Sequence, residues 1–238
     1  MSIYRPLNPD EFRDLQERIL YEDNHLLIFN KRTGEIVQGD KTGDEPLSET
    51  LKAFIAQRDG KPGQVFMGVP HRLDRPVSGA VIFAKTSKAL ERLNEMIRKG
   101  ELHTTYWALT SGKPPRDSDT LTDFLVRNEQ QNKSYVAANG KDNKDAKEAR
   151  LRYTLLQATD RYYLLEVELF TGRHHQIRCQ LAHMGCPIKG DLKYGARRSN
   201  PDGGICLLAR RIRFIHPVRK TEVDVVAPVP AGWKGVEA

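Results

Sequence analysis

An aspartate set among arginines is the residue pattern in this chain that is best suited to chemistry. Asp74 lies in the stretch His71-Arg72-Leu73-Asp74-Arg75-Pro76-Val77-Ser78-Gly79. A Gly/Pro-rich approach (61–70) precedes this stretch and an apolar run (80–84) follows it, which predicts a loop that enters a buried strand. Such loops often carry functional residues. An Asp flanked by Arg, however, is more commonly a solvated surface pair that contributes little to stability.

A second block of basic and polar residues, Thr-Gly-Arg-His-His-Gln-Ile-Arg, ends at Arg178. Ile177, Leu181 and Met184 share one helix face and Gly185 follows them, so the block leads into a short helix. Arg178 then emerges beside the apolar face, where an arginine needs a partner. The histidines and cysteine of this segment could suggest a metal site, but no acidic ligand pair or compact Cys/His cluster accompanies them.

The two blocks together resemble the HRLDxxTSG and TGRxHQIR signatures of the RluA-type family of RNA pseudouridine synthases. The second match continues through a Gly-x-Pro-Ile-x-Gly-Asp segment, here 185–191, and Tyr106-Trp107-Ala108 is similar to the family's Tyr-x-Ala context. The resemblance runs from about Tyr21 to Pro228.

Three positions depart from the family pattern. Val77 stands where the first signature usually has Thr, and Arg32 replaces Pro in a Lys-Pro-x-Gly turn. Leu208 occupies the centre of a Leu-His-Ala step. Val preserves the shape of Thr and lacks one hydrogen-bonding hydroxyl. Gly34 remains in the turn, so we expect the turn to form.

The resemblance implies a reaction and three catalytic residues. Uridine becomes pseudouridine when the bond from C1' to N1 breaks, the uracil turns, and the base rejoins the sugar through C5. Asp74 would supply an ionised carboxylate, as a nucleophile at C1' or at the base, or as a base in an elimination. Arg178 would be its ion-pair partner, and Tyr106 would stack on the uracil or assist proton removal.

The resemblance also implies contacts with RNA. A uridine inside a stem must be flipped out at a cost of about a few kcal/mol, and Arg72 would fill the vacated stack. We expect Arg75, Arg173 and His175 to contact RNA as well. The reaction needs no redox change and no energy input, so no cofactor and no metal are expected.

Composition agrees with a polyanionic partner. The chain has 38 Lys and Arg against 31 Asp and Glu, a formal charge of +7 and a pI near 9.3. Its three cysteines are odd in number and lack CxxC spacing, which favours a reducing compartment. The sequence has no signal-like segment and no apolar run of membrane length, so we expect a cytoplasmic protein that does not bind a membrane. We further expect a monomer, and the resemblance implies rRNA or tRNA as its partner.

The pattern of elements predicts an α+β fold with a mixed, mostly antiparallel sheet. We expect a helical extension at 1–20, a catalytic domain at 21–230 without a separate S4-like RNA-binding domain before it, and a tail at 231–238. Asn8 and Pro9 begin the first helix, strands cover 25–30, 103–110 and 162–170, and Ser87 caps a helix that ends at Gly100.

Two alternatives stand beside the isomerase. The first is a non-catalytic basic RNA-binding module of the same fold, in which the Asp74 loop is ordinary ion-paired scaffolding. The second is a base-excising glycosidase, which would also place a carboxylate near C1'. Such hydrolases usually need a second carboxylate to activate water, and none is tied by spacing to Asp74.

Overall fold

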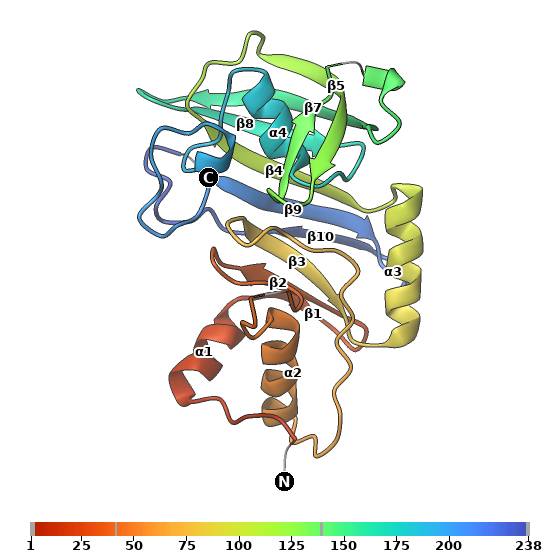
Figure 1. The fold of residues 1–238 in the computed structure, drawn as a ribbon. Helices are drawn as coiled ribbons and strands as arrows, with labels where there is room; N and C mark the ends of the chain where they lie inside the picture. Colours follow the sequence, from red (N-terminus) through yellow and green to blue (C-terminus); the bar gives the residue numbers. More distant parts are fainter. Residues whose placement is uncertain (1–2, 41, 139, 237–238) are drawn as a thin grey trace. The chain divides into compact units, whose positions relative to one another are not determined.

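The computed structural model describes residues 3–40, 42–138 and 140–236, which form two compact units (Figure 1). The first unit contains residues up to Leu102 and the segment 211–227, and the second contains 103–210 and the C-terminal residues from Pro228. Strand β9 (Leu207–Ile215) therefore contributes its first four residues to the second unit and its remaining residues to the first.

The first unit is built on antiparallel strands with three helices. Strands β1 (Ile19–Glu22), β2 (Leu26–Lys31) and β3 (Ser78–Ala84) pair in that order, and β10 (Glu222–Val226) pairs with residues 211–215 of β9. Every residue of β3 is buried, as expected for the apolar run after the Asp74 loop. Helices α1 (Pro9–Glu17) and α2 (Leu47–Arg58) meet through the rings of Phe12 and Phe54, whose centroids are 4.8 Å apart.

Local sequence signals explain two of these helices. The Asn8 side chain accepts a hydrogen bond from the Glu11 N–H and Pro9 follows it, as predicted for the start of α1. Helix α3 (Ser87–Lys99) ends at Gly100 in the left-handed conformation, also as predicted. Its cap was placed one residue too late, because Thr86 is the extended residue whose hydroxyl accepts from the Ala89 N–H.

The second unit is built on a run of neighbouring strands. Strands β4 (His103–Thr110), β8 (Tyr163–Leu169), β7 (Lys147–Ala158), β5 (Ser118–Asn128) and β6 (Lys133–Val136) follow one another in that spatial order. The ladders β4–β8, β8–β7, β7–β5 and β5–β6 are antiparallel. The α+β class with a mostly antiparallel sheet is thus confirmed.

One helix and two short 3-10 turns complete the second unit: α4 (Gln176–His183), η1 (Gly140–Asp142) and η2 (Leu192–Tyr194). Residues 176–181 are all buried, so α4 is enclosed on more sides than its expected apolar face. Cys179 of α4 and Tyr194 of η2 share an apolar cluster with Leu125 and Ala149 from β5 and β7. This cluster anchors α4 on the sheet and therefore fixes the backbone that carries Arg178.

Candidate active site

Asp74 is the first residue of a tight turn that leads into β3. The Val77 N–H donates to the Asp74 carbonyl oxygen at 3.0 Å, and the Arg75 carbonyl accepts from the Gly34 N–H at 2.9 Å. The Asp74 side chain is half-buried. Gly34 has a φ of +88°, so the turn opposite the Asp74 loop forms despite Arg32.

A fully buried lysine holds this turn from beneath. The exposed fraction of Lys31 is 0 %. Its ammonium donates to three backbone carbonyls, those of Arg32 (3.0 Å), Arg75 (3.1 Å) and Val77 (2.6 Å). Desolvation lowers the pKa of Lys31 to about 8, although the nearby charges of Glu35 and Asp74 oppose that shift. The Lys-Arg-Thr-Gly pattern that begins at Lys31 predicts a turn and gives no indication of these three hydrogen bonds.

His71 holds the other end of the same loop. Its Nε2 accepts a hydrogen bond from the Ile82 N–H of β3 at 2.9 Å. Burial lowers the pKa of His71 to about 4, so the imidazole is neutral at pH 7 and its remaining proton is on Nδ1. A neutral acceptor is what this hydrogen bond requires, because an imidazolium has only donors.

The two arginines of the loop differ in their surroundings. Arg72 is exposed. Arg75 contacts an acidic loop: its Nη1 lies 2.7 Å from Asp44 Oδ2, and its Nη2 donates to Thr42 Oγ1 at 2.8 Å. Asp40 lies 3.7 Å from the same guanidinium.

Tyr106 and Arg178 are positioned by β4 and α4 of the second unit. Tyr106 pairs in register with Val167 of β8 and is half-buried. Arg178 is 5 % exposed and forms a fork-shaped ion pair with Asp191. Its Nε donates to Asp191 Oδ2 at 2.7 Å and its Nη2 to Asp191 Oδ1 at 2.9 Å. The sequence places Asp191 at the end of the second signature and gives no local indication of this ion pair.

Arg173 and His175 lie in the segment before α4. The Arg173 Nε donates to the Glu148 carbonyl at 2.8 Å. His175 is buried with a φ of +52°, and its Nδ1 lies 3.0 Å from the Tyr194 hydroxyl. Burial first, and then the charge of Arg178, lowers the pKa of His175 to about 2. His175 is therefore a neutral side chain at pH 7, and its contact with RNA stays a prediction.

Known proteins identify the family. A family model described as RNA pseudouridylate synthase matches residues 25–183. Ribosomal large subunit pseudouridine synthase C of Vibrio cholerae is 31% identical over 92% of this chain and 67% of its own length. An uncharacterized RNA pseudouridine synthase of Bacillus subtilis, YhcT, is 32% identical over 92% of this chain and 70% of its own length. The chain belongs to the RluA-type RNA pseudouridine synthases.

Solved structures show the same fold. The human RNA pseudouridylate synthase domain containing 4 superposes with a TM-score of 0.78 at 23% identity, over 92% of this chain and 91% of that one. The predicted pseudouridine synthase-like fold is confirmed. Membership also confirms the predicted enzyme class, an isomerase that modifies RNA.

The side chains and helices of residues 3–40, 42–138 and 140–236 bear on metal binding and on membrane insertion. Among them, no three His, Cys, Asp or Glu side chains gather where they could hold a metal ion. Within the same ranges, no helix has the length and apolar character to cross a bilayer. Cys179, Cys186 and Cys206 are buried, free thiols.

Proposed function

We propose that this enzyme isomerises specific uridines of ribosomal RNA or tRNA to pseudouridine, with Asp74 as an ionised carboxylate. The observation that carries the proposal is the way the Asp74 turn is held. The fully buried ammonium of Lys31 donates to two carbonyl oxygens of the turn, those of Arg75 and Val77. The neutral imidazole of His71 accepts from the Ile82 N–H in the strand that follows. Such preorganisation is typical of a residue that must meet a reacting atom in one geometry.

Arg178 and Tyr106 complete the proposed machinery. Arg178 would pair with Asp74 and favour its charged form, and Tyr106 would stack on the extruded uracil or help to move a proton. Arg72, an exposed arginine on the Asp74 loop, would occupy the stack left by the flipped nucleotide. Arg75, Arg173 and His175 would contact the RNA around it. These roles rest on the family resemblance together with the positions of the residues on their elements.

Two features support the choice of partner and compartment. The formal charge of +7 favours a polyanion, and binding should weaken as salt rises because counterions are released. Three buried free thiols suit a reducing compartment, so we propose that the enzyme is cytoplasmic. We also propose that it acts as a monomer.

Tritium release from RNA labelled at uridine C5 tests the proposal. Ribosomal RNA and tRNA transcripts are each incubated with the wild type, with Asp74→Ala and with Asp224→Asn. The last variant is a matched control, because it removes an acid from an exposed ion pair with Arg211. We expect release from one RNA class, a loss of at least about a thousandfold in Asp74→Ala, and no change in the control.

Each alternative has its own signature in the same experiment. Free uracil in the supernatant would identify a base-excising glycosidase, since an isomerase keeps the base attached. Salt-sensitive binding of RNA with no tritium release from either transcript would identify a non-catalytic module.

A further inference from the structure

We propose that Asp191 is a positioning residue for Arg178 in the isomerisation, with the ring of Tyr194 as a second support of the same guanidinium. This inference rests on the proposed function and assigns a role to the Gly190-Asp191 step of the second signature. Asp191 would act through Arg178 and would itself touch no substrate.

The ion pair fixes the guanidinium in two directions. Two parallel N–H···O bonds, of 2.7 Å and 2.9 Å, join the Nε–Nη2 edge of Arg178 to both oxygens of Asp191. Such a fork sets the plane and the direction of the whole guanidinium, and with them the position of its other donors. The side chains of Arg178 and Asp191 are 6% and 1% exposed, so water does not compete for the pair.

The backbone of Asp191 is held by hydrogen bonds at both its carbonyl and its N–H, and this fixes the point from which the carboxylate extends. The Asp191 carbonyl accepts from the N–H groups of Tyr194 and Ala196, each at 3.0 Å, and its N–H donates to the Ile188 carbonyl at 3.0 Å. Gly190 precedes it with a φ of +89°, and a Cβ there would meet Gly204 O at 2.6 Å. Only glycine fits this approach, which explains a Gly-Asp step at this point.

The ring of Tyr194 lies against the Arg178 guanidinium and supports it. The Arg178 Cζ lies 5.1 Å from the centre of the Tyr194 ring, within the range of a cation–π contact. The ring is held through its hydroxyl, which accepts from the Ser134 N–H at 2.8 Å and lies 3.0 Å from His175 Nδ1. The Ser134 N–H and the His175 ring together hold the hydroxyl, and with it the ring, in one place.

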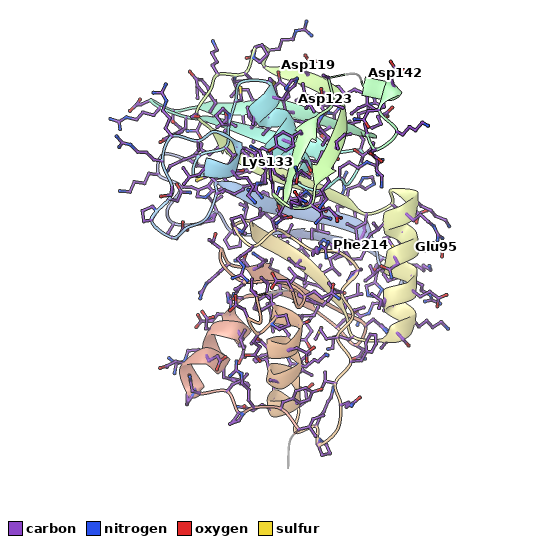
Figure 2. All side chains as sticks on the ribbon, in the orientation of Figure 1. Glu95, Asp119, Asp123, Lys133, Asp142 and Phe214 are labelled. Carbon is purple, nitrogen blue, oxygen red and sulfur yellow. The ribbon has the colours of Figure 1, made fainter. Side chains whose placement is uncertain are left out.

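The same support reaches the β5–β6 hairpin. Ser134 lies on β6, beside Lys133, which is labelled in Figure 2 and whose ammonium lies 5.2 Å from the Tyr194 ring. Cys179 of α4 donates its thiol hydrogen to the Ser134 carbonyl at 3.3 Å. Arg178 therefore lies in a framework of α4, η2 and β6 in which several elements specify one orientation.

Stability alone is a poor reason for this arrangement. Replacing a buried ion pair by apolar residues is often neutral or stabilising, because the desolvation of two charges offsets their attraction. A buried fork that orients an arginine is instead expected where the direction of the arginine's donors matters. The positioning role and a purely structural role make different predictions for the kinetics.

Asp191→Asn is the principal variant, because it keeps the shape of the side chain and removes its charge and one acceptor. Single-turnover tritium release should fall about 100-fold, the scale of an effect caused by small misplacement at a reacting centre. RNA affinity should stay within about threefold, because Asp191 touches no substrate. The control is Asp224→Asn, which breaks a fork of the same Nε and Nη2 geometry with exposed Arg211 and should leave the rate unchanged.

A double variant separates positioning from structure. If Asp191 acts through Arg178, then adding Asp191→Asn to Arg178→Lys should cost little beyond Arg178→Lys alone, since the fork is already lost. A structural role predicts two losses that multiply. Should Asp191→Asn fail to fold, Asp191→Glu decides. It keeps the charge and moves the carboxylate by one methylene, and its rate should fall about tenfold with the melting temperature retained.

Three outcomes would overturn the inference. Folded Asp191→Asn with a wild-type rate would do so alone, and so would losses that multiply with Arg178→Lys. Asp191→Glu with a wild-type rate would do the same if Asp191→Asn does not fold. A wild type that releases no tritium from either RNA would instead overturn the proposed function, and the role of Asp191 in the reaction with it.

Discussion

The Asp74 turn of the first unit and the Arg178 helix of the second hold their side chains by different means. Lys31 binds carbonyl oxygens, so the chain around Asp74 is fixed through its backbone. Asp191 binds the guanidinium of Arg178 directly, so that residue is fixed through its side chain. A short aspartate has few rotatable bonds and follows its backbone, whereas a long arginine needs support at its far end.

The difference predicts where each half of the machinery is vulnerable. Around Asp74, the loss of one buried cation leaves several backbone acceptors unpaired. Around Arg178, the loss of the Asp191 carboxylate loosens one guanidinium while helix α4 remains packed. Four variants or conditions test this comparison, taken from the largest expected change to the smallest.

Lys31→Met should have the largest effect on stability. Methionine matches the length of lysine but cannot donate, so the carbonyls of Arg32, Arg75 and Val77 lose their buried partner. We expect the free energy of unfolding to fall by about 2–4 kcal/mol, and tritium release to fall with it at temperatures where the variant is folded. Urea unfolding gives the first quantity.

The control for that variant is Lys52→Met. Lys52 forms an ion pair with Glu49 on helix α2 at the surface, worth less than about 0.5 kcal/mol. Equal losses in the two variants would contradict a special role of the Lys31 ammonium.

Alkaline pH should sharpen the contrast. The pKa of Lys31 is about 8 in the folded protein and about 10.4 in the unfolded chain. Between these values the unfolded chain binds more protons, so the contribution of Lys31 to the free energy of unfolding rises with pH, and it is flat below pH 8. The wild type should therefore gain at most about 3 kcal/mol relative to Lys31→Met between pH 8 and 10.4. A difference that stays constant from pH 7 to 10 would contradict the lowered pKa.

Tyr194→Phe should lower stability by a smaller amount and should hardly change the rate. The ring that faces Arg178 stays, while the Ser134 N–H loses its acceptor and His175 Nδ1 loses its hydrogen-bond partner. We expect the free energy of unfolding to fall by about 1–2 kcal/mol and the rate of tritium release to stay within about threefold. Tyr135→Phe is the control, because Tyr135 follows Ser134 on β6 and is 42% exposed. A 100-fold loss of rate in Tyr194→Phe would show that the hydroxyl matters more than the ring.

Arg75→Gln should change stability least. Its partners Asp40, Asp44 and Thr42 are exposed, and such pairs contribute less than about 1 kcal/mol. If Arg75 contacts a phosphate, the slope of log affinity against log salt should decrease in magnitude by about 1. An unchanged slope would remove Arg75 from the RNA contacts.

Local signals in the sequence were sufficient for much of the fold. Asn8 and Gly100 mark helix boundaries through hydrogen bonds and dihedral angles that involve only neighbouring residues. The uninterrupted apolar run 80–84 predicted a strand that is buried along its whole length. The cap of α3 was wrong by one residue because Thr86 and Ser87 offer the same hydroxyl, and only the backbone angles decide between them.

By itself, the sequence determined the fold class, the family and the loop that carries Asp74, because these depend on motifs and periodicities that are contiguous in the chain. The tertiary structure alone decided which side chains hold those motifs. Lys31 is 46 residues from Val77, and Asp191 is 13 residues from Arg178. Nothing local marks such partners, because a buried charge acquires its acceptors or its counter-charge only when distant segments pack around it.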